Sequence, residues 1–506
     1  MASKMMMPIA CAIAIVILFA GLGAEASIGI NWGRESAQRL VPSQVVDLLL
    51  QNGIRRARIY TSQRDILAAF AGSGINLTIS IMKPTLIKSK EDGRIWVQKN
   101  HAFFTPCTIR SVYFGGYPFH TGNGNRTFLQ SIVNAQRWLQ EALNERGFSD
   151  VKVNIAHIEG VLKQNISKPS EAEFKDEIKP ELVQYLQFLR ENNAPFLAEY
   201  IPIMDIHNKN FDLNFAFADN SSVLAITDVN GAVYTNIVEW RYDCYVWALE
   251  KLNFSDIKVS FSMVGWATDG YPDANATNAE RFFKHLLPWV SGNKGTPKRP
   301  GAPIDTNVHA LADETKMNAG PFTRHWGIYR SNGQPKYKID LTGQGRDIYP
   351  TVVRGVMRMP SRWCVYSGDR RDMAKVRAQL DWACSNSDCT STLIGGSCSR
   401  LTFEQNVTYA FNMYFQFRFQ DEKACQFEGL GRVAVNDPST EECVFPVEVV
   451  KGQQVNFQLN FAPPTLSGEG FRSQRPSLAL HVVWVSILVE FLLFWFQSVG
   501  GRFCYF

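Results

Sequence analysis

The 506-residue sequence carries little excess charge of either sign. Lys and Arg number 52 and Asp and Glu number 47, which gives a formal net charge of +5 at pH 7. Proteins that neutralise nucleic-acid phosphates concentrate far more basic charge, so we expect no nucleic-acid partner. Hydrophobic residues make up 45% of the chain, which excludes wholesale disorder and is enough for a large core. The length indicates more than one domain.

Cysteine is scarce in most of the chain. Six of the ten cysteines fall between residues 364 and 443, which predicts one small cross-linked module attached to a larger body. Their spacing lacks the paired Cys-x-x-Cys knuckles of zinc sites and favours disulfides, but it does not decide the pairing. Outside the module, Cys107 and Cys244 are either free buried thiols or a bridge. The module cysteines are Cys364, Cys384, Cys389, Cys398, Cys425 and Cys443.

One of two long apolar runs lies at the N-terminus. Lys4 precedes the run Ile9–Leu22, and Ala24-Glu25-Ala26 follows it. A basic start, an apolar run and a small-residue A-x-A site make up a secretory signal peptide, and this run is too short to span a bilayer. Residues 1–26 are therefore predicted to be a cleaved signal peptide.

The other apolar run lies at the C-terminus, in residues 478–506. A small-residue stretch that includes Ser467 and Gly468, and then a polar spacer, precede it, as in a GPI-attachment signal. A retained transmembrane helix is the alternative, but Glu490 within the run would be costly in lipid. We expect a GPI anchor at Ser467 or Gly468, which places the protein at the outer face of the plasma membrane and in the cell wall.

Asn-x-Ser/Thr sequons recur along the chain and predict N-glycosylation of a secreted protein. A further sequon at Asn76 has apolar neighbours that indicate a buried strand. The six sequons outside expected strand interiors are Asn125, Asn165, Asn220, Asn253, Asn275 and Asn406.

Residues 27–346 alternate between short β-rich runs and amphipathic helical stretches. Eight strands with crossover helices predict an α/β fold, a (β/α)₈ TIM barrel. The first run is not followed by Gly-x-Gly-x-x-Gly, so a doubly wound nucleotide-binding sheet has no support. The expected strands are Ile28–Trp32, Arg56–Tyr60, Leu77–Ile81, Ile109–Phe114, Val151–Ile155, Phe196–Tyr200, Ile257–Met263 and Ile304–His309. The expected helices include Pro42–Asn52, Thr127–Arg146, Glu171–Asn192, Val238–Leu252 and Asn278–Trp289.

Chemistry in such a barrel belongs at the C-terminal ends of the strands. The residues expected there are rich in aromatic rings, which suit the apolar faces of sugars but serve equally well as core or loop packing. They are Trp32, Tyr60, Tyr117, Glu199, Tyr200, Met263, Trp266, His309 and Glu314.

Six segments of the barrel region, in order along the chain, resemble plant glycoside hydrolase family 17, the β-1,3-glucanases. The resemblance implies a retaining hydrolase on a (β/α)₈ barrel, with one Glu as general acid/base and another as nucleophile. The segments are Ser27–Gly33, Arg56–Tyr60, Gly265–Gly270, Gly292–Pro297, Asp313-Glu314 and Arg324–Tyr329.

Both catalytic positions of that family are replaced here. The acid/base Glu of a Gly-Asn-Glu motif ending strand four corresponds to Tyr117, and the nucleophile of a Gly-Glu-x-Gly-Trp motif ending strand seven corresponds to Met263. A thioether has no anionic oxygen with which to attack, and a tyrosine of pKa about 10 is a poor proton donor for this task.

Two other carboxylates are candidates for relocated catalysis. The family's strand-six Asn-x-Tyr-Pro reads Glu199-Tyr200-Ile201-Pro202, and its auxiliary acid–Lys pair corresponds to Glu314 and Lys316. Catalysis by Glu199 and Glu314 would require carboxyls about 5 Å apart for retention, or about 6.5–9.5 Å for inversion. Three interpretations stay open: glucan binding without hydrolysis, an enzyme with relocated carboxylates, and a wall scaffold.

The cysteine module resembles the X8 domain, carbohydrate-binding module family 43. The resemblance implies β-1,3-glucan binding and the disulfides 364–425, 384–389 and 398–443. Tyr409, Tyr414 and Phe415 are candidate sugar platforms, although their near-helical spacing requires some of them to be core. The segments that carry the resemblance are Trp363–Val365, Leu380–Cys384, Gly395–Cys398, Tyr409–Phe415 and Cys443–Pro446.

The sequence thus predicts a TIM barrel followed by a small disulfide-rich carbohydrate-binding domain. We expect a cell-surface β-1,3-glucan (callose) binding protein of plant type, a monomer without metal or cofactor, with an active glucan endo-1,3-β-glucosidase as the alternative. The predicted order is signal peptide 1–26, barrel 27–346, linker 347–362, X8 module 363–448, linker with the GPI attachment region 449–477 and GPI signal 478–506. Expected substrate-binding residues are Trp32, Tyr60, Tyr200, Trp266, Lys316, Tyr409, Tyr414 and Phe415.

Overall fold

The computed structural model describes residues 26–122, 124–317 and 320–448. Most of the predicted signal peptide lies outside these residues, as do the GPI attachment site and the C-terminal tail. Within the described ranges, no helix is long and apolar enough to cross a membrane.

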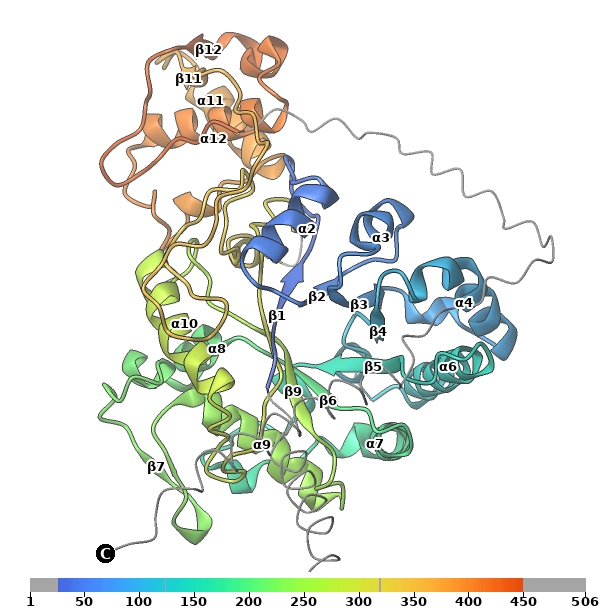
Figure 1. Cartoon of the computed structure of the whole chain (residues 1–506). Coiled ribbons are helices and arrows are strands. Elements are labelled where there is room, and N and C mark those ends of the chain that lie inside the picture. Colours follow the sequence, from blue (N-terminus) through green and yellow to red (C-terminus); the bar gives the residue numbers. More distant parts are fainter. Residues whose placement is uncertain (1–25, 123, 318–319, 449–506) are drawn as a thin grey trace, which may run out of the picture. The chain divides into compact units, whose positions relative to one another are not determined.

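Eight parallel strands close into a barrel, as the sequence predicted (Figure 1). Around the barrel the order is β1-β10-β9-β6-β5-β4-β3-β2. Every expected strand is present, with ends shifted by at most a few residues, which is normal because pairing frays at strand ends. The strands are β1 (Ile28–Trp32), β2 (Arg56–Ile59), β3 (Asn76–Ile81), β4 (Ile109–Phe114), β5 (Lys152–His157), β6 (Phe196–Tyr200), β9 (Val259–Val264) and β10 (Thr306–Val308).

Helices surround the barrel because each strand must be covered on its outer side. For example, Phe261 of β9 packs edge-on against Tyr242 of the preceding helix α9, with ring centroids 5.5 Å apart. The helices are α2 (Pro42–Gln51), α3 (Arg64–Phe70), α4 (Lys90–Phe104), α5 (Pro118–Thr121), α6 (Arg126–Glu145), α7 (Lys179–Glu191), α8 (Pro202–Lys209), α9 (Ile237–Lys251) and α10 (Ala276–Ser291).

Two local differences from the sequence prediction have clear causes. Helix α7 begins later than expected, because 3₁₀ turns at Pro169–Glu171 and Asp176–Ile178 occupy the start of the predicted helix. A small hairpin of β7 (Ile226–Thr227) and β8 (Val233–Tyr234) was not predicted, since two-residue strands leave no periodic pattern.

The module has its own small core around two helices and a two-stranded sheet. Strands β11 (Trp363–Tyr366) and β12 (Gly431–Ala434) pair antiparallel, beside α11 (Met373–Ser385) and α12 (Phe403–Phe417). The disulfides are Cys364–Cys425, Cys384–Cys389 and Cys398–Cys443, which confirms the pairing that the X8 resemblance implied. Cys107 and Cys244 are buried free thiols.

Candidate active site and carbohydrate-binding surfaces

A buried ion pair crosses the interior of the barrel. Arg58 of β2 and Glu199 of β6 lie on strands that are not neighbours, so their side chains can meet only inside the barrel. Arg58 Nη1 lies 2.5 Å from Glu199 Oε1, and the two side chains are 1% and 0% exposed. Ser262 of β9 completes the cluster, since its carbonyl accepts from Arg58 and its hydroxyl lies 3.4 Å from Glu199 Oε1.

Tyr117 occupies the end of β4 and turns toward this ion pair. Its hydroxyl donates to Glu199 Oε2 at 2.5 Å. Its backbone is left-handed, with φ 48°, directly after Gly116 with φ 85°. Such a conformation is costly for a bulky residue and persists only where the surroundings hold it. Burial and then the Glu199 carboxylate hold the pKa of Tyr117 well above its usual value, so the phenol keeps its proton.

Met263 lies next to Glu199 on the neighbouring strand β9. The two residues are Cα partners in the β6–β9 register, and Met263 is 7% exposed. The structure therefore brings Tyr117, Glu199 and Met263 together. All three were expected at the C-terminal ends of barrel strands.

Glu314 lies in the loop after β10 and is also buried. One carboxylate oxygen accepts from the backbone N–H of Glu35 at 3.1 Å. Gly33 allows this approach, since a Cβ there would lie 1.8 Å from Glu314 Oε1. Burial raises the pKa of Glu314 to about 7, while the Glu35 N–H acts in the opposite direction. Among the described residues no ion pair joins Glu314 to Lys316, whose ammonium instead lies 6.0 Å from the ring centroid of Phe417.

Tyr60 and His309 stand beside the Arg58 guanidinium. That group lies 4.8 Å from the ring centroid of Tyr60 and 3.9 Å from that of Tyr113. Burial, and then the charge of Arg58, lowers the pKa of His309 to about 3. His309 is therefore neutral at physiological pH and is not in the imidazolium form that acts as a general acid.

Several aromatic residues expected to bind sugar belong to the core instead. Trp32, Tyr200 and Trp266 are 3%, 1% and 0% exposed, so none presents a ring face to a ligand. The Trp266 indole donates to the Asp273 carbonyl at 3.1 Å, which fixes the ring inside the fold. Of the barrel aromatics proposed for sugar binding, only Tyr60 keeps part of its surface exposed.

The aromatic surface of the module differs from the expected one. Tyr409 and Phe415 are buried at 4% and 0% exposure, because their face of α12 forms the module core. Tyr414 is half-buried and contacts Trp382 of α11, with ring centroids 4.6 Å apart. Trp382 is 46% exposed and was missed as a site residue, although it lies within the Leu380–Cys384 motif.

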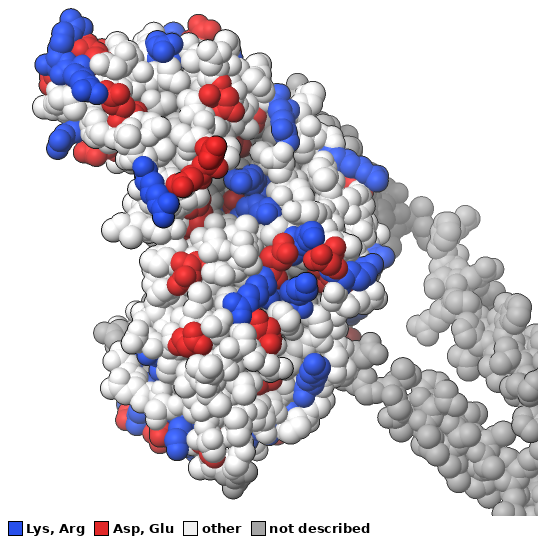
Figure 2. Space-filling model, turned by 90° about the vertical axis from the view of Figure 1, so that its left-hand side faces the viewer, with Lys and Arg blue, Asp and Glu red and all other residues white. Residues whose placement is uncertain are grey.

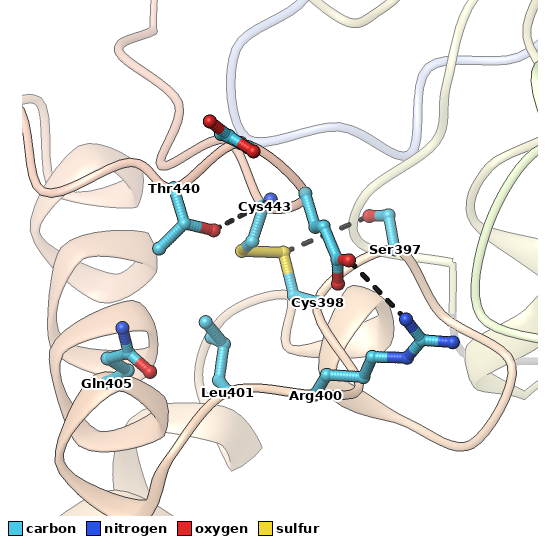
Figure 3. A pocket seen from close by; sticks show the side chains of 9 residues that line it. Ser397, Cys398, Arg400, Leu401, Gln405, Thr440 and Cys443 are labelled. Atoms are coloured by element: carbon cyan, nitrogen blue, oxygen red, sulfur yellow. Dashed lines mark hydrogen bonds and ion pairs between the residues drawn. A yellow bond between two sulfur atoms is a disulfide. The ribbon is translucent and has the colours of Figure 1, made fainter.

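A separate hollow of about 380 Å³ opens on the module beside the Cys398–Cys443 disulfide (Figure 3). Arg400 lies 3.4 Å from Glu442 at its edge, and the Thr440 hydroxyl accepts from the Cys443 N–H. None of the described residues that line the hollow is aromatic, so these residues offer no stacking surface for a sugar.

Charge is mixed on the face drawn in Figure 2, where Lys and Arg side chains lie among Asp and Glu side chains. Such a face gives no basis for phosphate-backbone binding. Among the described residues, no group of three or more His, Cys, Asp and Glu side chains is arranged to hold a metal ion.

The predicted glycosylation sites fall mainly on exposed surface. Asn125 and Asn275 cap α6 and α10 through their side-chain oxygens. Asn406 is half-buried, and its amide nitrogen donates to the Leu401 carbonyl at 3.5 Å. The exposed sites are Asn125, Asn165, Asn220, Asn253 and Asn275.

Comparison with known proteins supports the assignment of both the barrel and the disulfide-linked module. The model of glycosyl hydrolases family 17 matches residues 28–341, and that of the X8 domain matches residues 362–432. Glucan endo-1,3-beta-glucosidase 8 of Arabidopsis thaliana is 35% identical over 488 residues, 94% of this chain and 98% of its own. Glucan endo-1,3-beta-glucosidase 5 of the same plant is 34% identical over 465 residues, 90% of this chain and 94% of its own.

A solved structure supports the same family for the barrel. CJP38, a beta-1,3-glucanase and allergen of Cryptomeria japonica pollen, superposes with a TM-score of 0.59 at 28% identity, over 62% of this chain and 99% of that one. The chain therefore belongs to glycosyl hydrolases family 17 and carries a C-terminal X8 domain.

Proposed function

We propose that this protein binds β-1,3-glucan, such as callose, with hydrolysis lost or much reduced. The observation that carries the proposal is the state of Glu199, the carboxylate beside both replaced catalytic positions. Arg58 pairs with one of its oxygens and Tyr117 donates to the other. A retaining mechanism needs two available carboxyls, and Tyr117 and Met263 supply none.

Relocated catalysis by Glu199 would first have to break this cluster. Attack on an anomeric carbon requires a free carboxylate oxygen, whereas both oxygens of Glu199 are engaged and the side chain is 0% exposed. Removing a buried carboxylate from its cation is costly, because the remaining charge is left without solvent or partner.

Glucan binding is supported by the relatives and by the module. Both Arabidopsis relatives are named as glucan endo-1,3-beta-glucosidases, and they align over nearly the whole chain. On the module, Trp382 is half exposed and packs edge-on against Tyr414 with an interplanar angle of 63°, and its ring offers a face on which the apolar side of a sugar can stack.

Hydrolysis is tested with purified protein and laminarin, by measuring reducing ends. We expect release at the level of the blank, and a gain of activity in a Tyr117→Glu/Met263→Glu double variant. Turnover by the unmodified protein that Glu199→Gln abolishes would contradict the proposal.

Binding is tested by pull-down on insoluble β-1,3-glucan. We expect retention of the unmodified protein, and roughly 5-fold weaker retention of Trp382→Ala, since a lost stacking contact is worth about 1 kcal/mol. Tyr349→Ala is the matched control, because Tyr349 is an exposed aromatic (60%) outside the module. No retention of the unmodified protein would favour the wall-scaffold interpretation.

An active glucan endo-1,3-β-glucosidase is the second candidate, and one observation favours it. The pKa of Glu314 is raised by burial to about 7, the range in which a carboxylic acid can act as general acid. Loss of laminarin turnover in Glu314→Gln, from a protein shown to be active, would support this candidate.

We further propose that the protein is secreted and GPI-anchored at the outer face of the plasma membrane, and that it acts there as a monomer. Three disulfides and five exposed sequons are compatible with an oxidising extracellular compartment. Release from intact cells by a phosphatidylinositol-specific phospholipase, together with glycopeptide mass spectrometry, tests the anchor and the glycans.

A further inference from the structure

Three loops at the C-terminal face of the barrel contact the X8 module. They follow β1, β10 and β9, which are neighbouring strands in the barrel, so the loops form one continuous sector of that face. The barrel and the module belong to one compact unit of the chain. The three disulfides are all internal to the module and none links it to the barrel.

Asp388 of the module is the central anion of this contact. Its Oδ1 accepts from Arg324 Nη1 at 3.2 Å, and its Oδ2 lies 3.1 Å from His325 Nε2. The Asp388 side chain is only 1% exposed. Because Arg324 and His325 belong to the segment after β10, the module supplies the counter-ion of two barrel cations.

The same histidine connects to a second anion inside the barrel loop. His325 Nδ1 lies 3.4 Å from Asp313 Oδ2, and Lys336 donates to Asp313 Oδ1 at 2.6 Å. Charges of opposite sign therefore alternate from Lys336 through Asp313 and His325 to Asp388. Asp313 precedes Glu314, so this chain of charges runs beside the candidate acid.

Asp269 anchors the loop after β9. Its two carboxylate oxygens accept from Ser391 Oγ, Ser397 N and Ser397 Oγ, each at 2.8 Å. At the adjacent Gly270, a Cβ would lie 2.0 Å from Thr390 Cγ2. Only a glycine permits so close an approach of barrel and module here.

The loop after β1 makes the third contact. The Gln38 amide donates to the Gln416 carbonyl of α12 at 2.6 Å, and Ala37 packs against the apolar cluster of the module that contains Phe417. Lys316 lies over the Phe417 ring from the loop after β10.

We propose that the X8 module is a fixed part of the barrel's C-terminal face, held by Asp388 and Asp269, and that it keeps the Glu314 loop in position. The barrel sector formed by these loops is thus an interaction surface whose partner is the chain's own module. Without Asp388, the half-buried cations Arg324 and His325 would face each other with Asp313 as the remaining anion. A flexibly tethered binding domain would need none of these contacts.

The first test cuts the connection between the two domains. A recognition sequence for a site-specific protease is inserted between the exposed residues Met357 and Arg358 of the full-length chain. After cleavage we expect barrel and module to elute together in size-exclusion chromatography. Separate elution of the two pieces would overturn the proposal, and the result does not depend on whether the protein binds glucan.

The second test uses charge variants of the cleavable chain. Asp388→Asn is expected to weaken the association of the cut pieces on the order of 100-fold, because it removes the anion that Arg324 and His325 share. Asp381→Asn is the matched control, since Asp381 is an exposed carboxylate of the same module. In the uncut chain, Asp388→Asn should speed hydrogen exchange in peptides that cover residues 309–330.

A milder variant covers the case in which Asp388→Asn does not fold. Asp269→Asn removes a charge bound by two hydroxyls and one N–H, and should weaken the association roughly 10-fold. Unchanged association in Asp269→Asn and in any folded Asp388→Asn protein would overturn the proposal, as would weakening by Asp381→Asn of the same size.

Discussion

The barrel interior and the module contact each contain a half-buried histidine, and the surroundings of the two rings shift their pKa values in opposite directions. His309 stands near the Arg58 guanidinium, and burial and that cation lower its pKa to about 3. At His325, burial also acts to lower the pKa, but Asp388 and Asp313 outweigh it and raise the pKa to about 10. Burial therefore keeps His309 neutral at neutral pH, whereas two neighbouring carboxylates reverse the effect of burial at His325.

The comparison extends to the function of the two regions. In the barrel interior, one cation and one phenol engage both carboxylate oxygens of Glu199. At the module contact, cations and anions alternate across a boundary between domains. The first cluster thus lies within one domain, whereas the second lies between two.

The largest expected effect is the loss of Arg58. Arg58→Met leaves Glu199 buried without a cation, which should lower the free energy of unfolding by about 3–5 kcal/mol. The double variant Arg58→Met/Glu199→Gln should recover most of this loss, since it removes both charges. Urea denaturation at pH 7 measures both, and equal losses in the single and double variants would show that the ion pair is not the cause.

The two histidines should give mirror-image pH profiles of stability. The pKa of His325 is raised in the folded state, so its contribution is complete below about pH 6.5 and is lost as the pH rises toward 10. The pKa of His309 is lowered, so its contribution is present above about pH 6.5 and is lost as the pH falls toward 3.

Conservative variants separate the loss of stability at alkaline pH from the loss at acid pH. His325→Gln should lower the unfolding free energy at pH 6.5 by about 3 kcal/mol and should reduce the loss of stability between pH 6.5 and 10. His309→Gln should reduce only the loss of stability below pH 6.5. Thermal denaturation between pH 4 and 10 measures both. If both variants changed the stability on the same side of pH 6.5, the opposite pKa shifts of the two histidines would be contradicted.

Much of this fold could be predicted from the sequence, because it depends on local pattern. The eight strands are short β-rich runs separated by helical stretches, and each was recognisable alone. Tyr117, Glu199 and Met263 were expected to lie close together because parallel strands end at one face of a barrel. The disulfide pairing came from the X8 resemblance, which spacing alone could not supply.

Contacts between distant segments left weaker signals. Arg58 was missed as the partner of Glu199, although a charged residue between Ala57 and Ile59 in a barrel strand indicates an inward-facing side chain. The module contact could not be predicted at all, since Asp269 and Asp388 are ordinary loop residues until the fold places them together. Among the module aromatics, near-helical spacing indicated that some are core but not which ones.

Glu314 and its neighbour Asp313 are also two like groups whose pKa values shift in opposite directions. Burial acts to raise both pKa values, but Lys336 and His325 reverse this for Asp313, whereas burial prevails at Glu314 and raises its pKa to about 7. Its stabilising contribution is complete below about pH 4.5 and is lost as the pH rises through 7. The effect of Glu314→Gln on the unfolding free energy should therefore depend on pH. The change from the unmodified protein should be about 2 kcal/mol more favourable at pH 8 than at pH 4.5. An equal effect at both pH values would contradict the raised pKa.

The smallest effect is expected from Tyr117→Phe, which removes one hydrogen bond to Glu199 and leaves the Arg58 pair intact. The ring and its left-handed backbone stay, so the variant isolates the hydroxyl at Oε2. A lost hydrogen bond at a carboxylate that keeps its cation should cost about 1 kcal/mol in urea denaturation at pH 7. A loss as large as that of Arg58→Met would mean that the phenol, and not the guanidinium, holds the carboxylate in place. A loss near zero would leave Arg58 and Ser262 as the groups that satisfy it.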